Sequence, residues 1–370
     1  MSPAPKVLKD NPYLVELFGE TGWDDVRIQG FSLKALLRRP DVLHIHFPHH
    51  LVDWDKPLGA PFDVVTVLTS LWVARRRGVA VVWTGHDLAP HEHRRPRLWR
   101  LYNRLFLSQV DLLISLSNGA TELLRERYPQ LRRIPVEIIP HGHYRDHYTA
   151  PAEPEILAKK LGLDQRPVLL CFGLIRPYKN IPSLVRAWRQ LPSSRPQLMV
   201  VGRPLDAELE GEIRRAADGA DDIRLLLQYV DAEDVPSIFA CADAVVMPYA
   251  TGSALNSGAA HLALSMGTPV VVNDTAVNRD LQDFFGRDWV WRCAAATPEA
   301  ALETALAAAA APRPARPDLT LLDPDRLRAQ TKRAYGRAIG ARLGRGGPAG
   351  PGGGRKPEHD GLTSAHLGGV

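Results

Sequence analysis

An arginine and a lysine follow a short apolar run just past the middle of the chain. In "VLLCFGLIRPYKN", Gly173 comes directly after the apolar residues, and Arg176 and Lys179 follow in the next turn. A glycine lets the backbone pass close to a ligand, and two neighbouring cations can neutralise a diphosphate. Later in the chain, Ser257 and Gly258 open a helical pattern, and the free N–H groups of a helix start bind phosphate well. The two segments predict one site for a ligand with a diphosphate, although a solvated turn would also explain Arg176 and Lys179 alone.

A second group of reactive side chains lies in the first half of the chain. "WTGHDLAPHE" places His86, Asp87 and Glu92 just after an apolar run. A carboxylate at the end of a strand can act as a general base. We favour Asp87 for this role, with His86 holding the substrate. Asp87 could instead cap the helix that follows.

The stretch "HIHFPHH" (44–50) has a pattern that is also seen in metal sites. His44 and His46 lie two residues apart on one face of an expected strand, which is how some hydrolases begin a metal site. A metal-dependent hydrolase is therefore a rival hypothesis. Its further ligands would be His86, Asp87, His141 and His143.

The elements that must position these side chains form two series of apolar runs and amphipathic stretches. Buried strands are predicted at residues 42–47, 79–86, 110–117 and 136–142 in the first series, and at 168–173, 197–202, 223–230, 244–249 and 269–272 in the second. Strands that alternate with helices predict parallel sheets with helical crossovers. The expected fold class is α/β, with two Rossmann-like doubly wound domains facing a cleft. Ligands bind such sheets at the carboxyl ends of the strands.

The domain limits follow from the joints between these series. We expect a first domain over residues 1–147 and a second over 148–312. A helix over 313–344 should return toward the first domain. The tail, 345–370, is rich in Gly and Pro and is predicted to be disordered.

Composition and charge limit the setting in which the protein works. No apolar run reaches the roughly 18 residues that span a bilayer, and the first residues lack the layout of a signal peptide, so we expect a cytoplasmic protein. The net charge is +5, and residues 71–133 hold twelve Arg against five Asp or Glu, a net of +7. This basic stretch is either a solvated surface or a site of peripheral association with the inner face of a membrane. No nucleic-acid-binding motif accompanies it, and we expect no nucleic acid partner. Because neither GxxxxGK[ST] nor a strand followed by GxGxxG occurs, P-loop and nicotinamide enzymes are unlikely.

Several of these segments together resemble the GT-B-fold glycosyltransferases of group 1, or family-4-like glycosyltransferases. The segments are "CFGLIRPYKNIPSLVRAWRQL", "ADAVVMPY", "SGAAHLALSMGTPVVV", "WTGHDLAPHE", "LISLSNGATELL" and "IIPHGHY". Their order and spacing cover roughly residues 40–310. The resemblance implies a first domain that binds an acceptor and a second that binds a nucleoside-diphosphate sugar. It implies transfer of that sugar without a cofactor or metal ion.

The resemblance also assigns roles to individual residues. The donor diphosphate would be bound by Gly173, Arg176, Lys179, Ser257 and Gly258, and the nucleotide or sugar by Tyr229, Val230, Tyr249 and Asn256. His86 and Asp87 would be catalytic, and the acceptor side would include His46, His49, Glu92 and His141.

One departure from the family's pattern points to a subgroup. Retaining members carry two Glu eight residues apart, and Ala254 and Leu262 stand at the matching positions. The sequence is more similar to bacterial exopolysaccharide β-mannosyltransferases, which invert and pass mannose from GDP-mannose to a polyprenyl-diphosphate-linked saccharide. A glycan acceptor, a sugar-nucleotide epimerase of the same fold and an inactive scaffold remain alternatives.

Overall fold

A computed structural model describes residues 11–19, 23, 26, 39–56, 59–88, 95–192, 195–249, 255–312 and 315–344. Glu92, Ala254 and the predicted tail at 345–370 lie outside the described residues.

The first half of the chain forms a parallel sheet of four strands in the order β1-β2-β3-β4. The strands are β1 (Val42–Ile45), β2 (Ala80–Gly85), β3 (Leu112–Ser115) and β4 (Val136–Ile138). The other elements are α2 (Pro12–Phe18), η1 (Pro48–Leu51), α4 (Gly59–Arg76), α5 (Pro96–Leu107), α6 (Asn118–Arg127) and η2 (Pro129–Arg133). Apolar runs buried on both faces are typical of parallel sheets with helices on each side.

Alternate residues of this sheet enter two different cores. Val81 and Trp83 pack with residues of α4 and α5 on one face. Ala80 and Val82 pack with residues of α2 and the C-terminal helix on the other face. Helices α4 and α5 therefore cover the same side of the sheet.

The second half forms a parallel sheet of six strands in the order β10-β9-β8-β5-β6-β7. The strands are β5 (Val168–Phe172), β6 (Gln197–Val201), β7 (Ile223–Leu226), β8 (Ala244–Val246), β9 (Val270–Asn273) and β10 (Val290–Cys293). The helices are α7 (Pro154–Leu161), η3 (Pro177–Lys179), α8 (Ile181–Trp188), α9 (Ala207–Ala217), α10 (Val235–Ala240), α11 (Gly258–Met266), α12 (Ala276–Phe285) and α13 (Pro298–Ala310).

The strand order reverses between β5 and β8, which are neighbours in the sheet. Ligands of doubly wound sheets bind at this switch point, outside the carboxyl ends of the strands. Gly173 directly follows β5, and Tyr249 lies three residues beyond β8. The topology therefore brings the two segments of the predicted diphosphate site to one place.

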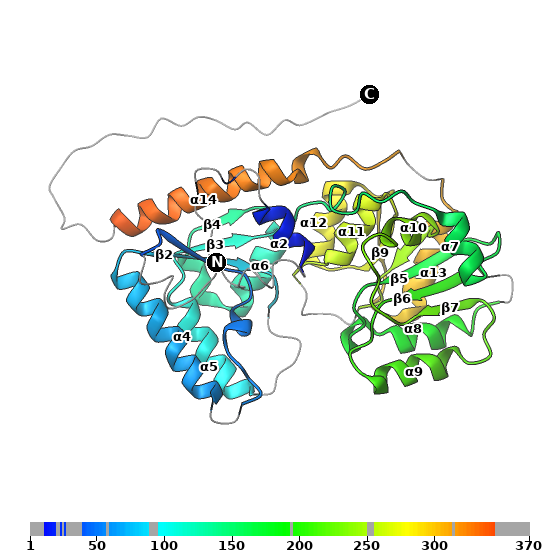
Figure 1. Ribbon diagram of the computed structural model, residues 1–370, viewed down its shortest axis with the longest axis horizontal. Helices are drawn as coiled ribbons and strands as arrows, with labels where there is room; N and C mark the ends of the chain where they lie inside the picture. Colours follow the sequence, from blue (N-terminus) through cyan, green and yellow to red (C-terminus); the bar gives the residue numbers. More distant parts are fainter. Residues whose placement is uncertain are drawn as a thin grey trace.

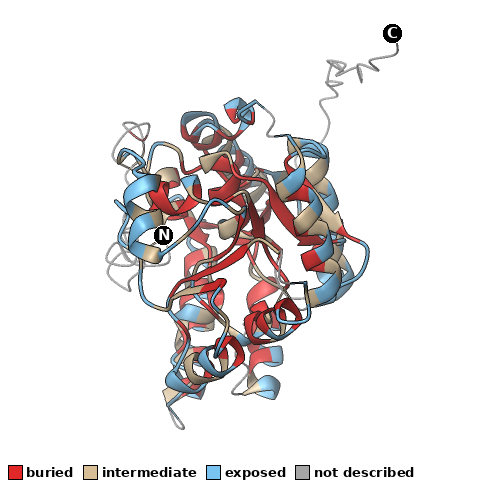
Figure 2. Cartoon of the chain, turned by 90° about the vertical axis from the view of Figure 1, so that its right-hand side faces the viewer, coloured by how far each residue is buried: buried red, intermediate tan, exposed pale blue. Residues whose placement is uncertain are grey.

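The chain crosses back to the first half after η4 (Thr320–Leu322). Helix α14 (Pro324–Gly344) contacts α2, β1, β2 and β3. Figure 1 shows α14 running alongside the N-terminal half, above β3 and β4. Figure 2 shows that the buried residues are concentrated in the strands and on the inner sides of the helices.

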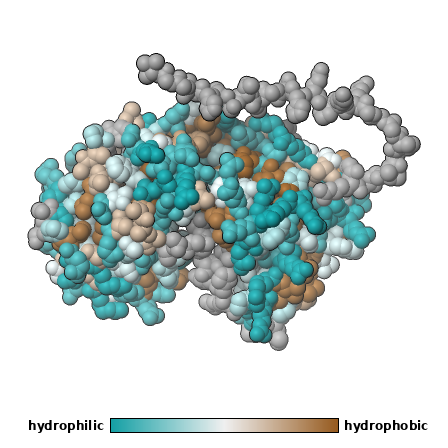
Figure 3. All heavy atoms as spheres, turned by 180° about the vertical axis from the view of Figure 1, so that it is seen from behind, coloured by the Kyte–Doolittle hydropathy of each residue, from teal (hydrophilic) through white to brown (hydrophobic). Residues whose placement is uncertain are grey.

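The predicted fold class is confirmed, because both halves are α/β units with parallel sheets. Figure 3 shows one face of the molecule, which is largely hydrophilic with dispersed hydrophobic residues. Within the described residues, no helix has the length and hydropathy needed to span a membrane.

Candidate active site in the cleft between the two sheets

Lys179 occupies a nearly enclosed position at the end of β5. Its side chain is only 8% exposed, and Nζ lies 3.5 Å from the carbonyl oxygen of Phe172 and 5.4 Å from the ring centre of Tyr249. Burial lowers the pKa of Lys179 below its ordinary value. No carboxylate among the described residues forms an ion pair with it. An anionic ligand beside Nζ would supply the missing negative charge and raise this pKa again.

Gly173 is needed beside this lysine for a steric reason. Its φ is +100°, and a Cβ atom there would lie 3.3 Å from Nζ of Lys179. The neighbouring Gly202, which follows β6, has a φ of +140° and would place a Cβ atom 2.1 Å from the carbonyl oxygen of Gly173. Gly202 therefore lets the ends of β5 and β6 approach closely, and Gly173 leaves space beside the ammonium group of Lys179.

The start of α11 faces the same position. Ser257 is its N-cap, and the Ser257 hydroxyl accepts a hydrogen bond from the N–H of Ala260. A Cβ atom on Gly173 would come within 3.9 Å of the Ala259 methyl group, so the first turn of α11 lies against the β5 loop. Gly258 is exposed and Arg176 is half-buried. The positive end of a nine-residue helix and two cationic side chains thus converge.

The residues predicted to bind the nucleotide or sugar are only partly brought together. Tyr249 packs edge-on against Tyr178 at 5.6 Å between ring centres, and Asn256 lies next to the α11 N-cap. Strand β7 ends at Leu226, before Tyr229 and Val230. Tyr229 is 67% exposed, whereas Val230 packs against the hydrophobic core that also contains residues of α2 and α14.

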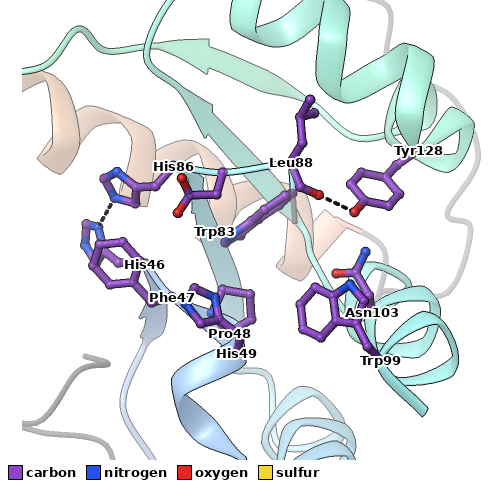
Figure 4. Close-up of a pocket in the computed structure, with 11 residues that line it drawn as sticks. His46, Phe47, Pro48, His49, Trp83, His86, Leu88, Trp99, Asn103 and Tyr128 are labelled. Carbon is purple, nitrogen blue, oxygen red and sulfur yellow. Dashed lines mark hydrogen bonds between the residues drawn. The ribbon is translucent and has the colours of Figure 1, made fainter. Parts of the chain in front are cut away.

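Across the cleft, His46 and His86 form a buried pair at the ends of β1 and β2. His46 Nδ1 lies 3.0 Å from His86 Nε2, and Figure 4 shows this bond beside Phe47. Burial lowers the pKa of both imidazoles well below the ordinary value; His44 lowers the pKa of His46 further, and His46 lowers that of His86. Both are therefore neutral at pH 7, with one donor and one acceptor nitrogen each. Neutral rings suit the hydroxyl groups of a sugar better than a phosphate.

The pair opens into a small pocket of the N-terminal half. Asp87 lines it, together with His49 of η1 and Trp99 and Asn103 of α5. Figure 4 shows Trp99, Asn103 and Tyr128 on the side away from His46. Of the acceptor-side residues predicted from the sequence, His46 and His49 line this pocket, whereas His141 is not among its lining residues.

Asp87 is half-buried directly after His86. The next described helix, α5, has Arg95 at its N-cap position, so Asp87 does not cap it. Tyr178 of the C-terminal half has a pKa raised mainly by burial and further by the charge of Asp87. The Asp87 carboxylate therefore lies within electrostatic range of Tyr178 in the other half of the molecule.

His141 lies in the segment that leaves β4, and its surroundings include residues that the sequence patterns did not reveal. Its ring stacks on His261 of α11 at 4.5 Å and lies 4.5 Å from the Tyr13 ring of α2. Its Nε2 bonds the Tyr144 hydroxyl at 3.1 Å. Burial lowers the pKa of His141 to about 4. In the sequence, the signal that could have indicated His261 is its position directly before Leu262, where retaining members carry a Glu.

A larger cavity of about 450 Å³ lies between the two halves on the other side of α11. One wall comes from residues 116–118, which follow β3, and from Ile138 of β4, and the other comes from α11 and α12, with His261 and Ser257 among the lining residues. Beside it, the N–H of Gly119 at the start of α6 donates to the Asp280 carboxylate of α12 at 2.6 Å. The two halves are thus in direct contact here.

The histidines of the rival metal site are used otherwise. His44 bonds Tyr335 of α14 through Nδ1 and Thr84 through Nε2, both at 2.7 Å. Among the residues that the structure describes, no three His, Cys, Asp or Glu side chains are grouped to hold a metal ion.

Comparison with known proteins assigns the chain to a family. Residues 166–309 match the family model "Glycosyl transferases group 1", and residues 20–142 match "Glycosyl transferase 4-like domain". The chain is 32% identical over 334 residues to a GDP-mannose:glycolipid 4-beta-D-mannosyltransferase of Xanthomonas campestris pv. campestris, covering 89% of each chain. The protein is a group 1 glycosyltransferase.

Other relatives of this glycosyltransferase agree with the assignment. A GDP-mannose-dependent monoacylated alpha-(1-6)-phosphatidylinositol monomannoside mannosyltransferase of Corynebacterium glutamicum is 33% identical over 146 residues, 36% of this chain and 37% of that one. Among solved structures, Anabaena HepE in complex with UDP and glucose has a TM-score of 0.57 at 16% identity, covering 84% of this chain and 78% of that one. The catalytic domain of starch synthase IV from Arabidopsis thaliana, bound to ADP and acarbose, has a TM-score of 0.56 at 17% identity, with 83% and 75% coverage. These structures show the GT-B fold.

The predicted family, fold and enzyme class are therefore confirmed, and the protein uses a nucleotide sugar. The hydrolase and epimerase alternatives have no support from the relatives. Leu262 is buried in the apolar core, so it cannot hold donor hydroxyl groups as the Glu of retaining members would.

Proposed function

We propose that the protein transfers mannose from GDP-mannose to a lipid-linked saccharide in polysaccharide assembly, with inversion at the anomeric carbon. The observation that supports it most is the buried ammonium of Lys179, which has no carboxylate partner among the described residues and lies at the switch point of the six-stranded sheet, beside Arg176 and the start of α11. The Xanthomonas relative uses GDP-mannose and a glycolipid. A glycan without a lipid is the second acceptor class.

The proposed reaction is a single displacement. The acceptor oxygen attacks C1 of mannose from the face opposite the diphosphate, and the bond from C1 to the β-phosphate oxygen breaks. Asp87 takes the proton of the acceptor hydroxyl. The electron pair leaves with GDP, whose growing negative charge is stabilised by Lys179, Arg176 and the α11 N–H groups.

We propose that the contacts of Lys179, Arg176 and the α11 N–H groups with the diphosphate replace a metal ion, and that no cofactor is required. Two cations and a helix start can neutralise a leaving diphosphate without a metal ion. The neutral His86, held by His46, would bind a hydroxyl group of mannose or acceptor. Tyr249 and Asn256 would contact the donor, and His49, Glu92 and His141 would border the acceptor.

The relative's acceptor also suggests where the protein works. We propose peripheral association with the cytoplasmic face of a membrane, through the basic N-terminal domain, and no nucleic acid partner.

A transfer assay tests this proposal. The full-length protein is incubated with GDP-mannose or UDP-glucose and a polyprenyl-diphosphate-linked saccharide in detergent, and the product's anomeric configuration is determined by NMR. We expect β-linked mannose from GDP-mannose alone. An α-linked product would contradict inversion, and transfer from UDP-glucose alone would contradict the donor.

A further inference from the structure

Trp83 of β2 has a buried indole nitrogen without a partner. Its side chain is 3% exposed and lines the small pocket beside Asp87, which we call the acceptor pocket. The Nε1 atom of Trp83 has no hydrogen-bond partner among the described residues. An indole nitrogen can only donate a hydrogen bond, and a buried donor without an acceptor costs stability. Native proteins contain few such groups, so this one indicates a bound group that accepts from it.

Asn103 of α5 lies on the same side of the sheet as Trp83. The Trp83 ring packs edge-on against Phe106 of α5 at 5.9 Å between ring centres, and Asn103 precedes Phe106 by about one helical turn. Asn103 is 4% exposed and also lines the acceptor pocket. In the view of Figure 4, Trp83 lies between Asn103 and His86. A strand and a helix that pack together thus each contribute a buried polar side chain to the acceptor pocket.

The contacts of Tyr128 determine how the Asn103 amide is oriented. The Tyr128 hydroxyl donates its proton to the carbonyl oxygen of Leu88. Burial raises the pKa of Tyr128, and a hydrogen bond from the Asn103 side chain opposes this increase. A hydrogen bond that favours the phenolate is donated to its oxygen, so the amide nitrogen of Asn103 points toward Tyr128. The amide oxygen, Oδ1, is then the atom that can accept a hydrogen bond from a group in the pocket.

The acceptor pocket has room for one small group. Its volume is about 20 Å³, and about 10–15 Å³ is enough for one water molecule, so a whole sugar ring does not fit. Trp83 supplies a donor and Asn103 an acceptor, which are the partners that a single hydroxyl group needs. A carboxylate would lack a proton for Oδ1 and would lie near the like charge of Asp87. Size and chemistry therefore favour a hydroxyl group.

We propose that Trp83 and Asn103 bind one hydroxyl group of the acceptor sugar and thereby determine which acceptors are used. The hydroxyl oxygen accepts from Nε1 of Trp83, and its proton is donated to Oδ1 of Asn103. This inference rests on the proposed function, in which a different hydroxyl of the same sugar loses its proton to Asp87. An acceptor sugar that lacks the bound hydroxyl leaves two buried groups unpaired and is rejected, and one that carries a carboxylate in its place is rejected by charge.

Transfer to deoxy acceptors tests this proposal. The full-length protein receives GDP-mannose and the polyprenyl-diphosphate-linked saccharide in detergent, with the terminal sugar either complete or lacking one hydroxyl other than the attacked one. We expect kcat/KM of the parent to fall at least about a hundredfold for one of the deoxy acceptors. Trp83→Phe keeps an aromatic ring but has no donor. It should lower kcat/KM for the complete acceptor by a similar factor and should use that deoxy acceptor about as well as the complete one.

Loss of this discrimination separates binding from packing. A variant that only disturbs the pocket would lower kcat/KM for both acceptors and keep their ratio. Asn103→Leu removes the acceptor Oδ1 and should lose the same discrimination, which keeps the test valid if Trp83→Phe does not fold. Trp72→Phe, at an indole of α4 that is 48% exposed, is the matched control and should keep the parent ratio. The proposal is overturned if the parent uses all deoxy acceptors equally, or if the pocket variants keep the parent ratio.

The indole N–H signal of Trp83 separates failure of this proposal from failure of the proposed function. In protein with isotopically labelled tryptophan, the NMR signal that is missing from Trp83→Phe is followed while the saccharide acceptor is added without GDP-mannose. We expect this signal to shift with the complete acceptor and to stay in place with one of the deoxy acceptors. If it does so although the parent transfers no mannose, the hydroxyl site stands and the proposed function is wrong. If the signal does not shift, the hydroxyl site is wrong, whether or not mannose is transferred.

Discussion

The two sides of the cleft differ in the kind of group that they present. The C-terminal side is cationic, with Lys179 and Arg176 beside the start of α11. Among the described residues, the N-terminal side presents the neutral, buried imidazoles of His46 and His86 and the carboxylate of Asp87. One side is suited to a leaving group whose negative charge grows, and the other to hydroxyl groups, one of which must lose a proton.

This difference explains how a metal-free displacement could be divided between two domains. Positive charge near Asp87 would lower its basicity, and a carboxylate near Lys179 would compete with the diphosphate. Placing the groups on separate sheets would limit both effects. Each variant or condition below tests whether the cationic groups and the proposed base act separately.

The largest effect is expected for the proposed base. Asp87→Asn removes the proton acceptor but keeps the size of the side chain, so turnover should fall about a hundredfold or more, with GDP affinity unchanged. Initial rates and GDP titration measure the two quantities. Asp41→Asn, an exposed carboxylate at the other end of β1, is the control. Turnover at the parent rate in Asp87→Asn would show that Asp87 is not the base.

Removing the buried cation of Lys179 should affect only the C-terminal side of the cleft. Lys179→Met should weaken GDP binding by at least about 2 kcal/mol, roughly thirtyfold. The melting temperature should stay the same or rise, because the variant no longer buries an ammonium that lacks a carboxylate partner among the described residues. Calorimetry with GDP measures the affinity, and the exposed Lys160→Met serves as control. Unchanged GDP affinity would place the diphosphate elsewhere.

Acid should destabilise the protein through its buried histidines. His141 has a folded-state pKa of about 4, below the ordinary 6.5, so protons bind the unfolded chain better. Its contribution to stability is complete above pH 6.5 and is lost as the pH falls toward 4. Between pH 7 and pH 5 this amounts to about 2 kcal/mol for His141.

Urea unfolding at the two pH values measures this loss, and His141→Gln should reduce it. Equal stability of the parent at both pH values would contradict the burial of these neutral rings.

The smallest effect concerns the contact between the halves. A Cβ atom at Gly119 would lie 2.6 Å from the carbonyl carbon of Ala276, so Gly119→Ala should push α6 away from α12. We expect turnover to fall by about tenfold or less, with GDP affinity kept. Gly336→Ala on α14, where the added atom meets nothing within 4 Å, is the control. Parent-like turnover in Gly119→Ala would show that this contact is not needed for alignment.

The closeness of Gly173, Lys179 and the start of α11 could be predicted from the sequence, because each segment is a short, continuous stretch at the end of a strand or the start of a helix. Gly173, Arg176 and Lys179 lie within seven residues that leave one strand, and the α11 start shows its own helical pattern. Parallel-sheet topology then fixes where the two segments meet. The strands were found for the same reason, since apolar runs buried on both faces are unmistakable.

The acceptor side could only partly be predicted, because its contacts join distant segments. Nothing near His141 in the sequence indicates that Tyr13 and His261 lie against it. The HxH spacing of His44 and His46 allowed a metal site as a rival hypothesis, yet His44 forms a hydrogen bond with Tyr335, 291 residues away. The spacing of residues in the sequence indicates which of them share a face of one helix or strand. It does not indicate which helices and strands pack together.

The most direct test of the central claim is the thermal unfolding of the protein with GDP, UDP, dTDP and zinc ions, each added separately. A nucleotide at about 100 times its dissociation constant adds roughly 2.7 kcal/mol of stability. We predict stabilisation by GDP, its loss in Lys179→Met, and none with zinc. Stabilisation by zinc alone would contradict a nucleotide site at Lys179 and would return attention to the histidines of β1 and β2.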